Sequence, residues 1–234
     1  MNNALPDEYV AFVPIRAGSK GLANKNIKPF AGLPLYEHAV RQGMRCCGAC
    51  IVSTDIDSVL SAPNSDGRIL HRRPAELSGD TTPMDDVLQE AIGSLGLAGK
   101  HIVLLQATSP LRSDANILEA IERHRSGEFD LVLSVAEGDR SILKSGLIED
   151  GRFVPVRKPE YCFTNRQSLP GVYRPNGAVY VFSCDRFLEN GGLATDNIGA
   201  VVMDASQSHD IDTEADFAHA ESIFSSTAVE KEMS

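Results

Sequence analysis

The chain has 234 residues, of which 22 are Lys or Arg and 32 are Asp or Glu, so its formal net charge at pH 7 is −10. This charge argues against a protein that binds nucleic acid or an anionic membrane, because both need a surplus of Lys and Arg. Hydrophobic residues make up 42% of the chain and charged residues 23%, which excludes an intrinsically disordered protein. The length suits one large domain, and no apolar run approaches the roughly 20 residues that a membrane-spanning helix needs.

The start of the chain, MNNALPDEYV, lacks the basic and apolar regions of a signal peptide. An odd number of cysteines, five, fits reduced thiols better than a disulfide framework. Cys47 and Cys50 have the CxxC spacing of a zinc or redox site, but no second CxxC follows. We therefore expect a cytoplasmic protein with structural cysteines.

Short runs rich in Val, Ile and Leu alternate with longer amphipathic stretches along the chain. This alternation is typical of βαβ units, so we predict an α/β fold with a mostly parallel sheet buried on both faces. The predicted strands are residues 9–15, 50–53, 68–71, 101–106, 130–135, 176–182 and 200–204. The predicted helices are residues 33–45, 82–95, 113–126 and 212–224.

Three of the predicted helices begin with residues suited to that position. Thr82 is a candidate N-cap with Pro83 at the first helical position, and Ser113 and Asp212 are candidate caps of the next two helices. Residues 137–175 break the alternation, because glycines, prolines and basic residues replace any helical periodicity. We interpret them as an extension of a single domain that covers residues 1–234.

The first candidate site is the sequence VPIRAGSKGLANKNIKPF, directly after the first predicted strand. Open α/β sheets bind their ligands where a strand ends in this way. Gly18 and Gly21 allow the backbone to approach phosphate oxygens, whose charge Arg16 and Lys20 can neutralise. The sequence matches neither the Walker nor the dinucleotide motif. It predicts a phosphate-binding loop, and the alternative is a solvated basic turn.

Two further strand ends carry polar residues. In HRRPAELSGDTTP, Arg72 and Arg73 precede a helix, and this segment either binds a base or phosphate group or forms a capped turn. In LLQATSPLR, Gln106 can present its amide at the carboxyl edge of the sheet, although a structural role is also open. Ser109 and Arg112 are expected to shape the turn that follows.

The last candidate site is the acidic sequence HDIDTEADF. In an extended segment, Asp210 and Asp212 point to one face, because an apolar residue, Ile211, separates them. Two such carboxylates suit a hard divalent ion. Asp216 is either an outer ligand or a helix cap. Basic loops and paired carboxylates at one sheet edge together indicate phosphoryl chemistry on a nucleoside triphosphate with Mg²⁺.

In order and spacing, these segments resemble the N-acylneuraminate cytidylyltransferases, also called CMP-sialic acid synthetases. The resemblance covers residues 9–224 and rests on PIRAGSKGLANKN, IVSTD, RPAELSGDTTP, LLQATSPLR, RPNGAVY and DIDTEADF. It implies a Rossmann-like three-layer fold. It also implies that CTP and a nine-carbon sugar acid give a CMP-sugar and pyrophosphate, by attack of the anomeric hydroxyl on the α-phosphate.

The resemblance also implies roles for individual residues. Arg16, Lys20 and Asp212 would be catalytic, and Asp210 and Asp212 would bind Mg²⁺. The nucleotide-binding residues that the resemblance implies are Ala17, Gly18, Ser19, Gly21, Asn26 and Arg73. The sugar-binding residues that it implies are Gln106, Lys144, Arg166, Arg174, Asn176 and Tyr180.

The resemblance gives the extension at about 137–175 a role in dimerisation. In the family, a comparable segment pairs with a second subunit and supplies basic side chains to the neighbour's pocket. Lys144, Arg166 and Arg174 stand at matching places and would neutralise the carboxylate of the sugar, so a homodimer is expected. The alternative for Arg166 and Arg174 is simple solubility on an exposed arm.

Two departures from the family leave the acceptor open. Residues 191–197, GGLATDN, stand where the family closes its sugar pocket with aromatic residues, and Gly79 stands where a hydroxyl residue is common. Sialic, legionaminic, pseudaminic and keto-deoxyoctonate acids are all candidate acceptors. The competing functions are a non-catalytic nucleotide-binding module and a nucleotidyltransferase for hexose phosphates.

Overall fold

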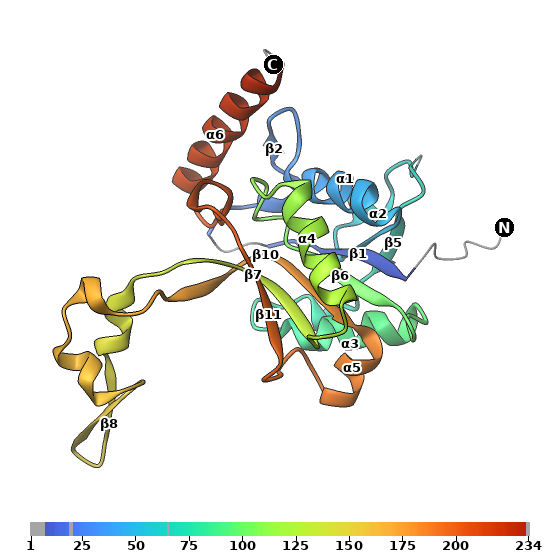
Figure 1. Ribbon diagram of the computed structural model, residues 1–234. Coiled ribbons are helices and arrows are strands. Elements are labelled where there is room, and N and C mark those ends of the chain that lie inside the picture. The colour runs from blue at the N-terminus through green and yellow to red at the C-terminus, as the bar shows by residue number, and fades with distance from the viewer. Residues whose placement is uncertain (1–7, 19–20, 65, 233–234) are drawn as a thin grey trace.

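The computed structural model describes residues 8–18, 21–64 and 66–232. At its centre is a seven-stranded sheet with the strand order β11-β7-β10-β6-β1-β4-β5 (Figure 1). Its strands are β1 (Tyr9–Pro14), β4 (Cys50–Thr54), β5 (Ile69–Arg72), β6 (His101–Leu105), β7 (Leu131–Glu137), β10 (Tyr173–Ser183) and β11 (Ile198–Val202). All seven predicted strands are found, and together they make this sheet.

The sheet is parallel except at β10, which runs antiparallel to both of its neighbours, β6 and β7. The helices of the described chain are α1 (Leu35–Cys47), α2 (Asp57–Leu60), α3 (Met84–Ser94), α4 (Asp114–Arg125), α5 (Cys184–Asn190) and α6 (Glu214–Glu232). Strand β1 shows how the layers form: Ala11 and Val13 pack with α1 and α4 on one face, and Val10 and Phe12 pack with α3 and α5 on the other. The predicted three-layer α/β fold is therefore confirmed.

Two of the predicted helix starts differ from the structure. Helix α3 begins at Met84, and Pro83 stands at its N-cap with no side chain capping it, so Thr82 is not the cap. For α6, the N–H of Asp216 donates to the Thr213 hydroxyl at 3.2 Å. The Asp216 carboxylate accepts in return from the Thr213 N–H at 2.8 Å. Thr213 therefore caps α6, and the carboxylate of Asp212 is available for another role.

The start of α4 agrees with the prediction. Ser113 is its N-cap and forms a capping box with Asn116, since each side chain accepts a hydrogen bond from the other residue's N–H. This cap fixes the turn between β6 and α4, which carries Arg112.

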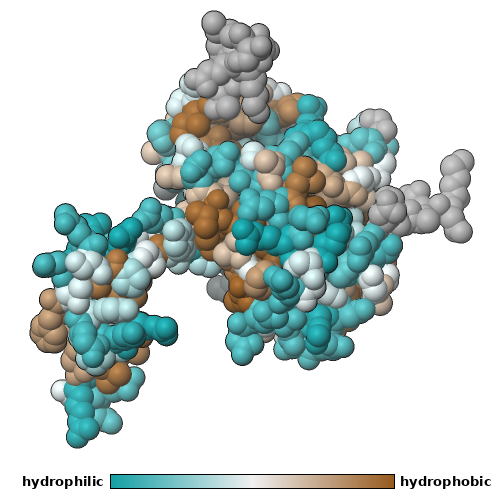
Figure 2. Space-filling view, in the orientation of Figure 1, coloured by the Kyte–Doolittle hydropathy of each residue, from teal (hydrophilic) through white to brown (hydrophobic). Residues whose placement is uncertain are grey.

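Residues 138–172 form an arm that leaves the body after β7 and returns to it at β10 (Figure 1). Its elements are η3 (Arg140–Lys144), β8 (Gly146–Glu149), β9 (Arg152–Pro155), η4 (Pro159–Phe163) and η5 (Arg166–Ser168). Strands β8 and β9 form a hairpin that is separate from the main sheet. The arm exposes large apolar side chains, which are Ile142, Leu147, Ile148, Phe153, Val154, Val156 and Phe163. Figure 2 shows brown patches among the hydrophilic surface of the arm.

The smaller elements of the body are η1 (Lys25–Ile27), β2 (Pro29–Phe30), β3 (Leu33–Pro34), η2 (Ala75–Leu77) and η6 (Ala205–Gln207). Helix α6 packs over the β2-β3 hairpin, where Phe217 meets Phe30 edge to face. Within the described part of the chain, no helix is both long and apolar enough to cross a membrane.

A buried histidine lies at the amino end of the sheet. The Nδ1 atom of His124, on α4, lies 3.0 Å from the Tyr9 hydroxyl, and the ring of His101 lies edge to face against it. Burial, and then the neighbouring His101, lower the pKa of His124 from 6.5 to about 4. His101 in turn pairs with Glu8. The native state therefore holds His124 neutral at a pH where the unfolded chain would protonate it.

This difference predicts a loss of stability in mild acid. Because the pKa of His124 is depressed in the folded state, the unfolded state binds more protons below pH 6.5, and the unfolding free energy falls as the pH falls toward 4. Between pH 7.5 and pH 5 we expect His124 to contribute roughly 2 kcal/mol of this fall. Guanidinium unfolding at both pH values, for the wild type and His124→Gln, measures it. An equal fall in both proteins would contradict the assignment.

Candidate active site

The candidate site residues gather at one edge of the sheet. The parallel strands β1, β4, β5, β6 and β11 all end at this edge, and the antiparallel strand β10 begins there. Residues that follow these strands, such as Arg16, Asp55, Gln106 and Asp210, therefore come together although they are far apart in the sequence.

The loop after β1 is held by hydrogen bonds to its neighbours. The N–H of Ala17 donates to Asp55 Oδ1 at 2.8 Å, and Asn26 Nδ2 donates to the Arg16 carbonyl at 3.0 Å. Gly21 passes so close to Asp212 that a Cβ atom there would lie 2.4 Å from the Asp212 carbonyl oxygen. This position therefore requires glycine. Ser19 and Lys20, which we predicted to act on the nucleotide, lie outside the described residues.

Arg16 is the first cation of this loop after β1. Its Nη2 atom lies 2.5 Å from Asp80 Oδ1, and its Nη1 atom donates to the carbonyls of Ala17 and Gly18. Gly18 has a φ of 71°, in the left-handed region, which turns the loop back on this guanidinium. Arg16 is thus held at the loop by an acidic partner from the segment after β5.

A pocket of about 690 Å³ opens beside this loop, at the ends of β4 and β5. It is lined by Asp55, Asp57, Arg72, Arg73, Pro74, Ala75, Ser78 and Gly79. Arg73 is buried, and its Nη2 atom donates to the Ser53 carbonyl at 2.9 Å, which fixes the guanidinium to β4. Burial lowers the pKa of Arg73. The structure thus brings Arg73 and Gly79 into one pocket next to Arg16.

A buried lysine joins the phosphate loop to the acidic segment. Lys25, on η1, is only 8% exposed. Its Nζ atom donates to the Ile211 carbonyl and to Asp212 Oδ1, the latter at 3.0 Å. In the sequence, Lys25 is one of four basic residues between Pro14 and Lys28, and nothing there distinguishes it from the others. Lysine is almost never fully buried unless it is paired. The partner of Lys25, Asp212, is distant in the sequence, so only the folded structure reveals the pairing.

Asp210 and Asp212 flank the fully buried Ile211, whose N–H donates to the Thr108 carbonyl at 2.9 Å. Both residues are exposed as a whole, and the side chain of Asp212 is 75% exposed. The protein around Asp210 nevertheless raises the pKa of its carboxyl, mainly by desolvation and then through the charge of Asp212, against a hydrogen bond from Thr108 that lowers it. The spacing predicted from the sequence is therefore realised as two neighbouring acids at the sheet edge.

The carboxylates of Asp210 and Asp212 suit a divalent ion when other ligands complete the coordination shell of that ion. Among the residues that the structure describes, no three His, Cys, Asp or Glu side chains are grouped to hold a metal ion. Two carboxylates alone do not make a closed protein site, but they suit an ion that keeps its waters and binds substrate phosphates as well. Asp210 and Asp212 have the oxygen donors that Mg²⁺ requires.

The CxxC spacing does not mark a metal site. Cys47 ends α1 and Cys50 begins β4, and all five cysteines are free. Burial raises the pKa of Cys47 to about 12, so this thiol stays protonated and is a poor ligand or nucleophile.

The predicted sugar-binding residues in the body lie where β6 and β10 meet. Asn176 Oδ1 accepts from the Ser134 hydroxyl at 2.6 Å, and its Nδ2 atom donates to Ser208 at 2.9 Å, so its amide ties β7 and the segment after β11 to β10. The side chain of Gln106 lies against Gly177. Burial and then the charge of Asp210 raise the pKa of Tyr180, which places its hydroxyl in the field of that carboxylate.

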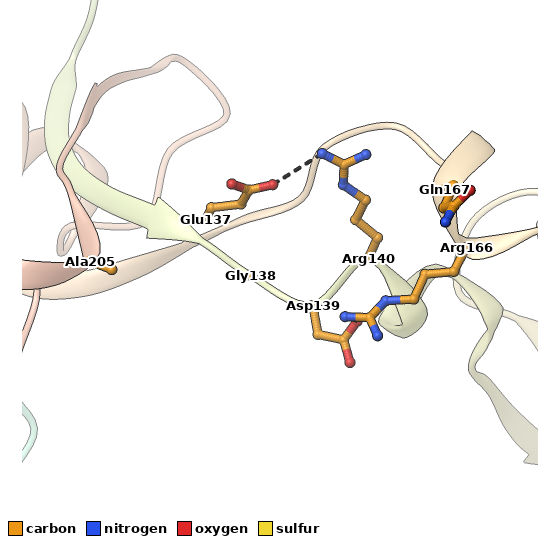
Figure 3. A pocket seen from close by; sticks show the side chains of 7 residues that line it. All are labelled: Glu137, Gly138, Asp139, Arg140, Arg166, Gln167 and Ala205. Atoms are coloured by element: carbon orange, nitrogen blue, oxygen red, sulfur yellow. Dashed lines mark hydrogen bonds and ion pairs between the residues drawn. The ribbon is translucent and has the colours of Figure 1, made fainter.

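The other predicted sugar-binding residues lie on or beside the arm. A second pocket, of about 720 Å³, is lined by Glu137, Gly138, Asp139, Arg140, Arg166, Gln167 and Ala205 (Figure 3). In it Arg166 pairs with Asp139 at 3.1 Å. Lys144 lies on η3, and Arg174 is exposed on β10 at the base of the arm. Lys144 and Arg166 thus lie on the arm, and Arg166 shares this pocket with Ala205 of the body.

Residues 191–197, which depart from the family pattern, are held away from these side chains. Thr195 donates to Asp130 at 3.2 Å, and Asn197 Nδ2 donates to the Glu128 carbonyl at 3.0 Å. Both partners precede β7, at the edge of the sheet opposite to Asp210. This half of the segment therefore does not border the predicted acceptor side.

Comparison with known proteins identifies the family. The family model described as cytidylyltransferase matches residues 10–176. The chain belongs to this cytidylyltransferase family. It is 29% identical to the post-translational flagellin modification protein B of Campylobacter coli, over 90% of this chain and 92% of that protein.

Two further relatives bear on the substrate. The CMP-N,N'-diacetyllegionaminic acid synthase of Campylobacter jejuni is 30% identical over 93% of this chain and 95% of that protein. The N-acylneuraminate cytidylyltransferase of Streptococcus agalactiae serotype V is 31% identical over 90% of this chain. The chain spans about half the length of this second relative, 52%. The predicted resemblance to N-acylneuraminate cytidylyltransferases is thus confirmed.

A solved structure shares the fold. The CMP:2-keto-3-deoxy-manno-octonic acid synthetase complexed with CTP superposes with a TM-score of 0.70 at 16% identity, over 94% of this chain and 100% of that one. This likeness confirms the Rossmann-like architecture. Because the chain belongs to the cytidylyltransferase family, it is a nucleotidyltransferase that uses CTP. Cytidylyltransferases generally use a divalent metal ion.

The contact between Lys25 and Asp212 predicts a large effect of substitution. Lys25→Met removes the cation that holds Asp212 and the phosphate loop together, so we expect kcat/KM for CTP to fall about 100-fold. Lys28→Met is the matched control, since Lys28 pairs with exposed Glu214 on the surface and such pairs contribute little. Steady-state kinetics with circular dichroism measures both. Equal losses in the two folded variants would contradict the role of Lys25.

Proposed function

We propose that the acceptor of this cytidylyltransferase is a nonulosonic, sialic-type acid, and that the enzyme works with Mg²⁺ as a cytoplasmic homodimer. The anomeric hydroxyl oxygen forms a bond to the α-phosphorus of CTP, the bond from that phosphorus to the β-phosphate oxygen breaks, and pyrophosphate leaves. The hydroxyl proton passes to a base at the site. The observation that carries this proposal is the contact of the phosphate loop with the Asp210 and Asp212 segment, which puts cations and carboxylates side by side.

On the nucleotide side, backbone amides and basic side chains would bind the triphosphate. We assign the amides to Ala17, Gly18, Ser19 and Gly21 and the charges to Arg16 and Lys20. Arg16 would exchange its bond to Asp80 for one to a phosphate, because guanidinium groups bind carboxylates and phosphates in the same geometry. Asn26 holds the loop through the Arg16 carbonyl. The pocket that contains Arg73 lies where the cytosine ring would sit.

Asp210 and Asp212 would hold Mg²⁺ together with phosphate oxygens of CTP. When bound, the ion supplies positive charge that offsets the charge developing on the leaving pyrophosphate. Desolvation, and after it the charge of Asp212, raise the pKa of Asp210, and a cation bound between the two carboxylates would offset both effects. Lys25 keeps Asp212 in place.

The apolar arm supports the homodimer. Phe163 is 90% exposed on η4, and the arm exposes further large apolar side chains along its hairpin. Apolar surface of this kind marks a protein contact. In a dimer through the arms, Lys144 and Arg166 would reach the partner's acceptor side, and Arg174 would stand at the base. The five free cysteines fit a reducing cytoplasm.

A legionaminic-type acid is the second candidate acceptor. The relative named as a CMP-N,N'-diacetyllegionaminic acid synthase is 30% identical and matches this chain over 95% of its own length. Both candidate acceptors carry the carboxylate that the basic arm residues would neutralise. An assay of both acids, with the product mass measured, distinguishes them.

A panel of acceptors tests the proposed function. The protein is incubated with CTP, Mg²⁺ and sialic, legionaminic, pseudaminic or keto-deoxyoctonate acid, and pyrophosphate and product mass are measured. We expect a CMP-sugar with at least one nine-carbon acid. The Asp212→Ala variant should lose at least 100-fold in rate, because Asp212 is a proposed ligand of the metal. It should stay folded, because the side chain of Asp212 is 75% exposed. Turnover of none of these acids by the folded protein, or turnover of keto-deoxyoctonate acid alone, would overturn the proposal.

The arm gives a separate prediction for assembly. Phe163→Glu should shift the protein from dimer to monomer in analytical ultracentrifugation, because a charge cannot be buried in an apolar contact without a partner. Leu118→Glu is the matched control, since Leu118 is 51% exposed on α4, outside the arm. We expect the control to remain a dimer. A monomeric wild type, or a dimeric Phe163→Glu variant, would rule out assembly through the arm.

A further inference from the structure

A second buried cation lies under the same edge of the sheet, and the chemistry described above does not use it. Arg112 follows β6 and is only 2% exposed. Among the described residues, no carboxylate forms an ion pair with it, and its Nε and Nη2 atoms have no hydrogen-bond partner. Asp114, two residues on, forms a two-pronged pair with Arg45 instead.

The one bonded nitrogen of Arg112 joins two strands. Its Nη1 atom donates to the carbonyl oxygens of Gln106, at 2.6 Å, and Ala178, at 3.2 Å. The last ladder pair between β6 and β10 at this edge is Leu105 with Val179. Arg112 therefore continues the pairing of the two strands by one more residue on each, beyond the point where their own ladder ends.

The two residues held in this way border the predicted acceptor side. Gln106 carries the amide assigned to the sugar. Ala178 follows Gly177, which has a φ of 79° and lies against the Gln106 side chain. Between Pro175 and Tyr180 the register of β10 against β7 shifts, and on that side the Ser134 hydroxyl, in place of a regular ladder, bonds to Asn176 and Val179. Gln42 fixes Arg112 itself, since its Nε2 atom donates to the Arg112 carbonyl at 2.6 Å.

Among the residues that the structure describes, no carboxylate forms an ion pair with Arg112, and the charge of nearby Asp114 offsets the cost of its burial only in part. Burial lowers its pKa to about 9, which leaves it protonated at pH 7. Nearby Cys46 does not offset this charge, because burial raises the pKa of its thiol to about 11. A buried cation without a partner is unfavourable, and its field is screened less than that of a surface charge. An anion bound at the adjacent edge offsets it.

We propose that Arg112 is a positioning residue of the acceptor side: it fixes the ends of β6 and β10 around Gln106, and its uncompensated charge favours an acceptor that carries a carboxylate. This inference rests on the proposed function for the acceptor. It assigns Arg112 no contact with CTP, because the loop and the pocket proposed for CTP follow β1, β4 and β5, whereas Arg112 follows β6.

Two substitutions separate the two parts of this role. Arg112→Lys keeps the charge and loses the fork of donors, and Arg112→Gln keeps a donor and loses the charge. Arg68→Gln is the control for general destabilisation, because Arg68 is also largely buried but pairs with Glu37 and Asp66. Thermal unfolding of all three variants shows which of them are folded at the assay temperature.

The kinetic test compares the effect of each substitution on the KM for the sugar acid with its effect on the KM for CTP. We expect Arg112→Gln to raise the KM for the sugar acid about tenfold or more, with the KM for CTP within about twofold, as for the loss of a charged hydrogen bond. Arg112→Lys should recover most of this loss, and Arg68→Gln should change neither constant. A raised KM for CTP, or a folded Arg112→Gln variant with an unchanged KM for the sugar acid, would overturn the proposal.

A second measurement does not depend on activity. Hydrogen exchange in the free protein should show about tenfold faster exchange in Arg112→Gln at the amides of residues 106–108 and 176–179, with no matching change in β4. Unchanged exchange there would refute the positioning role even if no acceptor is turned over. An inactive wild type with the expected exchange pattern would instead count against the proposed acceptor.

Discussion

The ammonium group of Lys25 connects the two halves of this site. It is buried between the loop after β1 and the acidic segment before α6, and it binds both the backbone and the side chain of that segment. Residues separated by most of the chain thereby become one surface. Without this contact, the phosphate loop and the two aspartates would be independent loops at the edge of a sheet. A buried charge is stable there only because a carboxylate and a carbonyl surround it.

The net charge of −10 conceals this separation of charges. Basic groups gather at the loop that we propose binds the phosphates, and acidic groups stand next to them on the segment that would hold the metal. Every described cation of the loop has an acidic partner: Arg16 with Asp80, Lys25 with Asp212 and Lys28 with Glu214. A site that is neutral in this way can accept a highly charged nucleotide together with its metal without a large change in its own net charge.

The fold and the chemistry of the strand ends followed from local patterns. Runs of Val, Ile and Leu mark strands because a sheet covered on both faces excludes polar residues, and the loops after these strands carried the polar groups that the site needs. Helix starts were less predictable: Thr213 and Asp212 are adjacent and both suited to a cap, and only the path of the chain decides between them. Lys25 and Arg112 were missed as functional residues, because their roles come from burial against segments distant in the sequence.

The reversed direction of β10 has a consequence for how this enzyme can vary. Because β7 ends and β10 begins at the same edge of the sheet, the segment between them leaves and re-enters the body beside the acceptor side. A parallel β10 would have sent that segment across a face of the sheet as an ordinary crossover helix. One inverted strand thus gives the chain a stretch that can lengthen, shorten or change its apolar surface without altering the core. In the dimer proposed above, the contact with the partner subunit and the residues that would select the sugar could therefore evolve together, at one point of insertion.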